Sequence, residues 1–229
     1  MIILALDTTT RAGSAAVVRD GLVVAEHVGD AGVTHGQRLP ADLERVLDAA
    51  SIRIDAVDMF AVAAGPGSFT GLRVGIATVQ GLALARGRLV VPVSVLEALA
   101  RSAPRTDQPV AAWMDAQRGE VFAELYAAGG GASVLPPVSA PPAVVLDAMA
   151  GIAGDVPVFI GDGAVRYAAD IRARYGAGVH TLPPPSLAGT IGRMAAADPS
   201  RAVHPHALAP IYIRRPDAEL ARARRDAGR

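Results

Sequence analysis

The chain has 229 residues, of which 51% are hydrophobic and 4% aromatic, and its formal net charge is zero. Such a chain folds as one large domain or two small ones around a core of small aliphatic side chains. The zero charge excludes a global attraction to nucleic acid or anionic membrane, and the lack of cysteine and lysine excludes disulfides, thiolate zinc sites and lysine phosphate clamps.

The first hundred residues alternate between strand and helix patterns. Residues 1–6 are a continuous apolar run, which is typical of a strand buried on both faces. Asp20-Gly21 lies between two short apolar runs and predicts a hairpin turn. The further expected elements are a helix over 35–51, a strand over 57–64, a helix over 71–86, a strand over 89–93 and a helix over 94–101.

A proline-containing segment over 102–109 predicts a linker, which divides the chain into an N-terminal lobe (1–104) and a smaller C-terminal lobe (105–229). The second half contains a predicted hairpin (110–126), a helix (141–149), a strand (156–160), a turn (161–163) and a helix (186–197). Both halves therefore run hairpin, helix, strand, helix. This order predicts two related α/β lobes.

A glycine-rich loop, Gly65-Pro66-Gly67-Ser68, joins the predicted strand 57–64 to helix 71–86. Its backbone N–H groups could bind an anion at the start of the helix, which Ser68 or Thr70 can cap. The loop matches neither a P-loop, a nucleophile elbow nor a dinucleotide fingerprint, because it lacks the lysine and the glycine spacing that these motifs need. It predicts either phosphate contact or a tight turn made for packing.

Asp7 ends the first predicted strand and is followed by three threonines. A carboxylate at this position could hold hydrated Mg²⁺ with hydroxyl groups beside the phosphates of a nucleotide. Alternatively, Asp7 and the threonines only satisfy backbone donors at the end of the strand. The candidate nucleotide contacts are therefore Asp7, Thr8, Thr9, Gly65, Gly67 and Ser68.

Helix 71–86 is apolar on nearly every side, which requires burial all round. One face can lie on its own sheet. Two sets of small residues at helical spacing would let a second helix approach closely. One set is Gly71, Gly75 and Thr78, and the other is Ala77, Gly81 and Ala85. In a chain of this length, that helix could belong to another subunit.

Several segments together resemble the bacterial TsaB (YeaZ) family, the dimerisation subunits of the tRNA threonylcarbamoyladenosine machinery. The resemblance covers nearly the whole chain and is carried by residues 4–10, 65–73, 80–83, 115–121, 161–163 and 210–214. It implies an actin-like (ASKHA, RNase H-like) fold of two lobes with mixed sheets flanked by helices. It also implies a non-catalytic role beside the catalytic subunit TsaD and the ATPase TsaE, in a complex that modifies N6 of adenosine 37 in tRNA.

The resemblance implies that helices 35–51 and 71–86 form a heterodimer interface with TsaD and a homodimer interface when the chain is alone. The expected interface residues are Leu39, Leu43, Leu47, Gly71, Leu72, Val74, Gly75, Thr78, Val79 and Leu82. ATP and Mg²⁺ are expected for the complex and no cofactor for this chain, and tRNA is reached through the complex.

TsaD carries a pair of metal-binding histidines where this chain has Val95 and Leu99. Neither aliphatic side chain can bind a metal, so the resemblance implies a paralogue without the catalytic metal. The alternative is an actin-like kinase or ATPase that uses Asp7 and the Gly65–Gly67 loop. A charge-free membrane span and a leader are not found, so the cytoplasm is the expected location. The arginine-rich segment 214–229 predicts a solvated helix or tail, or a contact with RNA or an acidic partner.

Overall fold

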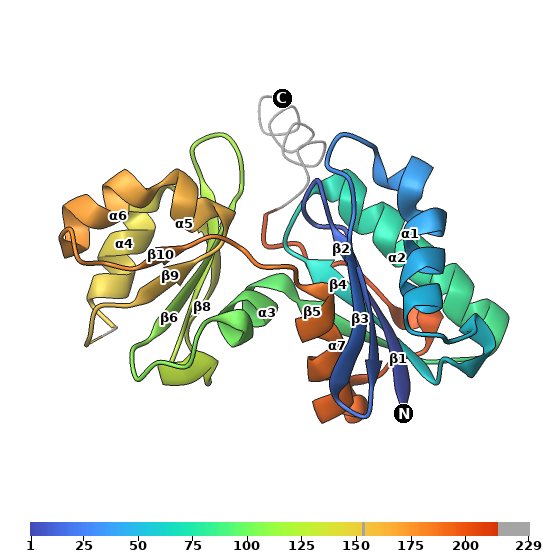
Figure 1. The fold of residues 1–229 in the computed structure, drawn as a ribbon. Coiled ribbons are helices and arrows are strands. Elements are labelled where there is room, and N and C mark those ends of the chain that lie inside the picture. The colour runs from blue at the N-terminus through green and yellow to red at the C-terminus, as the bar shows by residue number, and fades with distance from the viewer. Residues whose placement is uncertain (153, 215–229) are drawn as a thin grey trace, which may run out of the picture.

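The computed structural model describes residues 1–152 and 154–214, which form two mixed five-stranded sheets flanked by helices (Figure 1). The first sheet has the strand order β3-β2-β1-β4-β5. Its strands are β1 (Ile2–Asp7), β2 (Ser14–Arg19), β3 (Leu22–Val28), β4 (Met59–Gly65) and β5 (Val90–Ser94).

The second sheet repeats the topology of the first. Its strands are β6 (Val110–Asp115), β7 (Val121–Tyr126), β8 (Ser133–Ala140), β9 (Val158–Ile160) and β10 (Thr181–Leu182). Its order, read from the other edge, is β8-β7-β6-β9-β10. In both sheets the first strand pairs antiparallel with the second and parallel with the fourth. The expected pair of related lobes is confirmed.

Helices cover the outer face of each sheet and fill the space between the two sheets (Figure 1). The first sheet carries α1 (His35–Ala49) and α2 (Phe69–Arg86), and the second carries α4 (Pro142–Ala150), α5 (Asp162–Arg166) and α6 (Ala168–Tyr175). Between the sheets lie α3 (Val95–Ser102) and α7 (Ala188–Ala197). Short 3₁₀ helices η1 (Ile54–Ala56), η2 (Ala128–Gly130), η3 (Pro199–Arg201) and η4 (Pro205–Ala207) complete the elements.

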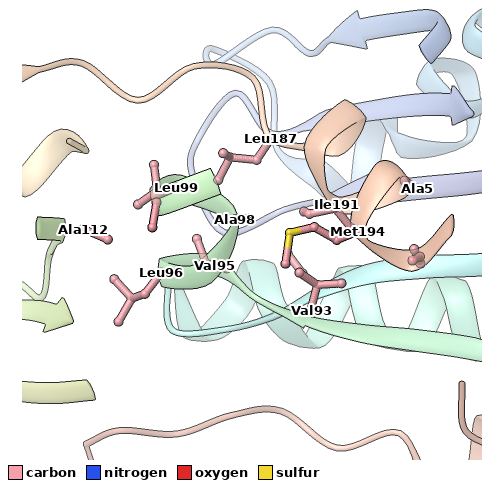
Figure 2. Packing of buried hydrophobic residues seen from close by; sticks show 14 of the residues in the cluster. Ala5, Val93, Val95, Leu96, Ala98, Leu99, Ala112, Leu187, Ile191 and Met194 are labelled. Carbon is pink, nitrogen blue, oxygen red and sulfur yellow. The ribbon is translucent and has the colours of Figure 1, made fainter. Parts of the chain in front are cut away.

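The continuous apolar run of β1 is explained by burial of both faces of the strand. Ile3 and Ala5 point into the core between the two sheets, whereas Leu4 and Leu6 point into the core beneath α1 and α2. Because side chains alternate across a strand, positions 3–6 of β1 must then all be apolar. The core between the sheets joins both lobes, since it includes Ala5 of the first sheet and residues of α3, α7 and the second sheet (Figure 2).

The C-terminal segment returns to the first lobe, which corrects the expected division at residue 104. Helix α7 packs on β1, β2 and β4. Val203 pairs with Val90 of β5, and the Ile211 amide donates to the carbonyl of Ala64 at 2.7 Å. The first lobe is therefore built from both ends of the chain, and the expected lobe 105–229 is not one structural unit.

Strand β8 and helices α5 and α6 are among the elements that were not expected from the sequence. Strand β8 includes Pro136 and Pro137, but it is an edge strand, where proline is tolerated because one side of its backbone needs no ladder hydrogen bond. The segment 161–163, expected as a simple turn, begins α5, and α6 follows it directly.

Candidate functional site

One oxygen of the Asp7 carboxylate, at the end of β1, is hydrogen-bonded within its own loop. Its Oδ1 accepts hydrogen bonds from the Thr9 amide at 2.8 Å and the Thr9 hydroxyl at 2.6 Å. Asp7 is only 3% exposed, and burial raises the pKa of its carboxyl group while the Thr9 hydrogen bonds oppose that shift. A cation or phosphate outside the loop therefore finds little of this carboxylate to bind.

Thr8 is the contact between the Asp7 loop and helix α2. Its hydroxyl donates to the carbonyl of Gly71 at 2.8 Å. A Cβ atom at Gly71 would lie 2.0 Å from the Thr8 carbonyl oxygen, and one at Gly75 would lie 2.1 Å from the Thr8 hydroxyl oxygen. These glycines therefore permit close approach of α2 to its own β1 loop. The expectation that they permit approach of another subunit is wrong.

The Gly65–Ser68 loop is packed from two sides. A Cβ atom at Gly65, whose φ is 124°, would lie 2.5 Å from the carbonyl oxygen of Ile211. One at Gly67 would lie 2.5 Å from the Cβ of Thr9. The loop is thus pressed between Thr9 and the returning C-terminal segment. Its glycines have a packing role, which was one of the two alternatives that the sequence left open.

Ser68 caps α2 as predicted, because its Oγ accepts from the Gly71 amide at 3.3 Å. Beside this cap lies a pocket of about 460 Å³, bounded by the loop after β1, the loop before α1 and the first turns of α2. Its lining combines hydroxyl groups, one imidazole and one guanidinium with apolar atoms: Thr10, Arg11, Ala31, Gly32, Val33, Thr34, His35, Gly36, Ser68, Thr70, Gly71 and Val74. Of the six predicted nucleotide contacts, only Ser68 lines this pocket.

The second lobe has an equivalent carboxylate that the sequence reasoning did not assign. Asp115 ends β6 as Asp7 ends β1, and Gly161, directly after β9, has the same φ of 124° as Gly65 at the end of β4. The Asp115 carboxylate accepts from the Gln117 amide at 3.0 Å, the Gln117 side chain at 2.7 Å and Arg166 at 3.0 Å. The available signal was an aspartate directly after a buried strand, which occurs at both positions.

The carboxylates at the ends of β1 and β6 are the oxygen donors to compare with the needs of nucleotide-bound Mg²⁺. Such a cation is held by carboxylate oxygens, phosphates and water. Here Asp7 is buried against Thr9, and Asp115 is paired with Arg166. One oxygen of Asp7 and both oxygens of Asp115 thus already accept hydrogen bonds from the protein.

The residues exposed on the outer surface of α1 and α2 differ from the residues expected at the subunit interface. Several of its predicted members are buried in the first lobe or against Thr8, namely Leu39, Leu43, Gly71, Leu72, Gly75 and Val79. The half-buried members are Leu47, Val74, Thr78 and Leu82. The exposed face of α2 is formed by Arg73, Ala77, Gly81, Leu84 and Ala85. Ala77, Gly81 and Ala85 therefore face outward, whereas Gly71 and Gly75 face inward and Thr78 lies between the two faces.

Val95 and Leu99 are core residues of α3, with exposed fractions of 0% and 1% (Figure 2). They pack in the core between the sheets, which also contains Ile191 of α7 and Leu187, the residue before this helix. Within residues 1–152 and 154–214, no group of three or more His, Asp or Glu side chains could hold a metal ion. The predicted arginine-rich tail lies outside the described residues, except for Arg214, which pairs with Glu120.

No helix among the described residues is long and apolar enough to span a bilayer.

Comparison with known proteins gives a consistent set of relatives. Residues 29–146 match the family model described as TsaD, tRNA N6-adenosine threonylcarbamoyltransferase. The tRNA threonylcarbamoyladenosine biosynthesis protein TsaB of Haemophilus influenzae is 38% identical over 125 residues, or 53% of this chain and 52% of the relative. The match thus spans about half the length of this relative. An uncharacterised protein of Mycobacterium tuberculosis is 32% identical over 227 residues, covering 95% of this chain and 93% of the relative.

Solved structures extend the similarity over the whole fold. YeaZ from Pseudomonas aeruginosa has a TM-score of 0.74 and 31% identity, covering 92% of this chain and 99% of YeaZ. A second P. aeruginosa structure, described as an uncharacterised protein with similarity to peptidase YEAZ, has a TM-score of 0.77, 31% identity and coverages of 93% and 99%. The fold is the actin-like (ASKHA) fold of these proteins.

Proposed function

Because the chain belongs to the TsaB/YeaZ family of tRNA threonylcarbamoyladenosine biosynthesis, we propose that it is a non-catalytic partner subunit of the threonylcarbamoyl transferase. The observation that carries this proposal is the burial of Asp7. The carboxylate that an ATP-using protein of this fold would direct at Mg²⁺ is 3% exposed and bonded to Thr9. The aliphatic pair Val95 and Leu99 supports the same role, because neither side chain can ligate a metal.

The proposed partner is TsaD, together with the ATPase TsaE. The surface proposed for docking is the exposed face of α2, where Ala77, Gly81 and Ala85 leave room for a second helix and Leu84 is 43% exposed. A Cβ atom at Gly81 would meet no atom within 4 Å, so the helix backbone itself is accessible there. Small residues allow close packing of helices, and burial of the apolar atoms supplies the affinity. Without the partner, the same face is expected to pair with a second copy.

The alternative function, an actin-like kinase or ATPase, would need Asp7 or Asp115 to bind a cation. Asp7 would first have to lose its hydrogen bonds to Thr9, and Asp115 its pair with Arg166. A peptidase activity, which the description of one solved structure suggests for YEAZ, has no support in the motifs of this chain. The partner-subunit role is therefore preferred.

The experiment that tests the proposal compares Gly81→Arg with wild type in pull-down with TsaD and in light scattering. An arginine at the centre of the docking face would be buried in the interface with no carboxylate to pair with. Binding to TsaD and self-association should therefore both weaken at least tenfold. Ala169→Arg is the matched control, because Ala169 is exposed on α6, on the second lobe. Folded Gly81→Arg protein that keeps both associations would place the interface elsewhere. If wild type does not bind TsaD, the proposed role itself fails.

A further inference from the structure

A second pocket lies between α3, α7 and η3, away from the loops that carry Asp7 and Asp115. Its volume is about 460 Å³, and its lining consists of Glu97, Arg101, Thr190, Arg193, Met194, Ala197, Asp198 and Arg201. None of these residues lines the pocket beside Ser68. Helices α3 and α7 both lie between the two sheets, so the pocket is formed where the lobes meet (Figure 1).

Positive charge exceeds negative charge in the lining, which has three arginines and two carboxylates. Glu97 is shared, since its Oε1 pairs with Arg101 at 3.1 Å and its Oε2 with Arg201 at 3.2 Å. One carboxylate thus serves two guanidinium groups. In the described part of the chain, Arg193 has no carboxylate within 4 Å, and Nη2 donates instead to the hydroxyl of Thr190 at 2.9 Å.

The three guanidinium groups are held in place before any ligand arrives. Arg101 and Arg201 are oriented by Glu97, and Arg193 is oriented by Thr190, which is only 5% exposed. Side chains that are already ordered lose less conformational entropy when a ligand binds. Their N–H groups form planar forks, which match the oxygen geometry of phosphate.

From this arrangement we infer that the pocket binds a small phosphate monoester, with its phosphate on Arg193, Arg101 and Arg201. A phosphate dianion complements the surplus positive charge of the lining better than a neutral ligand does. Met194 and Ala197 form an apolar wall against which the organic part of the ligand would lie. The volume lies in the range of ordinary small-molecule pockets and exceeds the needs of a single inorganic anion. This inference does not depend on the proposed docking of α2.

The test is titration calorimetry of the isolated chain with phenyl phosphate and inorganic phosphate, at constant ionic strength set with sodium chloride. Wild type should bind both, and phenyl phosphate more tightly because of the apolar wall. Arg193→Ala should weaken binding at least tenfold, and Arg193→Lys less, since lysine keeps the charge but loses the planar fork. Arg172→Ala, an exposed arginine on α6, is the matched control and should bind as wild type does.

Glu97→Gln is a second variant, for which tighter rather than weaker phosphate binding is expected. It removes the negative charge that competes with phosphate for Arg101 and Arg201, while the glutamine oxygen can still accept a hydrogen bond and orient one of them, so phosphate affinity should rise severalfold. Thermal unfolding of each variant checks that the fold is retained. The inference is overturned if wild type binds neither phosphate, if folded Arg193→Ala binds as wild type does, or if Arg172→Ala loses as much affinity. Binding of a short single-stranded RNA that Arg193→Ala abolishes, without binding of phenyl phosphate, would likewise overturn it in favour of an RNA contact.

Discussion

Gly75 offers a direct test of how α2 is seated on the first lobe. A Cβ atom there would lie 2.1 Å from the Thr8 hydroxyl oxygen and 3.2 Å from its Cβ and Cγ2 atoms. Gly75→Ala must therefore push α2 and the β1 loop apart by more than an ångström at their closest contact. The same change at Gly81 meets no atom within 4 Å.

The expected energies follow from two opposing effects. Overpacking of a close contact costs about 1–3 kcal/mol, whereas alanine in place of glycine favours a helix interior by about 1 kcal/mol. Gly75→Ala should thus destabilise the protein by up to about 2 kcal/mol, and Gly81→Ala should stabilise it by about 0.5–1 kcal/mol. For a chain of this size, each kcal/mol shifts the melting temperature by about 2–4 °C.

The assay is urea unfolding of Gly75→Ala, Thr8→Ala, the double variant and Gly81→Ala. Thr8→Ala alone loses the hydrogen bond to Gly71, at a cost of about 1 kcal/mol. It also removes the atom that the new methyl group would meet, so the double variant should be more stable than the sum of the single effects by about 1–2 kcal/mol. The inward orientation of Gly71 and Gly75 would be refuted if Gly75→Ala and Gly81→Ala were equally stable. It would also be refuted if the unfolding free energy of the double variant equalled the sum of the effects of Gly75→Ala and Thr8→Ala.

Two further predictions concern Asp7 and the absent metal site. Burial raises the pKa of Asp7 above its ordinary value of 3.8, so the native state binds this proton more tightly than the unfolded chain, and stability is lost as pH rises through the raised pKa. Asp7→Asn keeps an oxygen for the Thr9 donors and should gain stability over wild type as the pH rises above 3.8; a difference in unfolding free energy that stays constant with pH would contradict this. Purified, untagged protein should contain no stoichiometric transition metal, because Val95 and Leu99 stand where a metal-binding pair would lie. It should also hydrolyse little ATP, because Asp7 is buried. Metal bound at residues 92–100, or ATP turnover that Asp7→Asn abolishes, would favour the enzyme alternative.

Much of the fold was predictable because its signals are local. The apolar run of β1 reports burial on both faces, and the structure places Leu4 and Ala5 in different cores. Helix α2 was predictable from its length, its serine cap and its apolar character. Strand β8 was not, because its prolines disfavour a strand unless the strand lies at an edge, and position within a sheet is a tertiary property.

The candidate site shows the same limit. The sequence indicated that the Asp7 loop and the Gly65 loop act together, and Ser68 does donate its amide to the carbonyl of Thr9 at 3.1 Å. Glycines at 71 and 75 indicated a close approach, but a helical spacing cannot say which neighbour approaches. The neighbour is Thr8, 63 residues from Gly71 along the chain. The contact between Ile211 and Gly65 could not be predicted either, since no local sequence signal links the two segments.

One contact connects the enclosed carboxylate to the surface proposed for docking. Thr8 follows Asp7 directly, and its hydrogen bond to Gly71 holds the start of α2 against the β1 loop. With Gly71 and Gly75 turned inward, the helical period turns Ala77, Gly81 and Ala85 outward. An open Asp7 site with room for a nucleotide would require α2 or its loop to withdraw from Thr8 and Thr9, which would disturb the seating of the whole helix. Enclosure of Asp7 and presentation of a small-residue helix face are thus two consequences of the same packing, as expected for an actin-like lobe used to bind a partner.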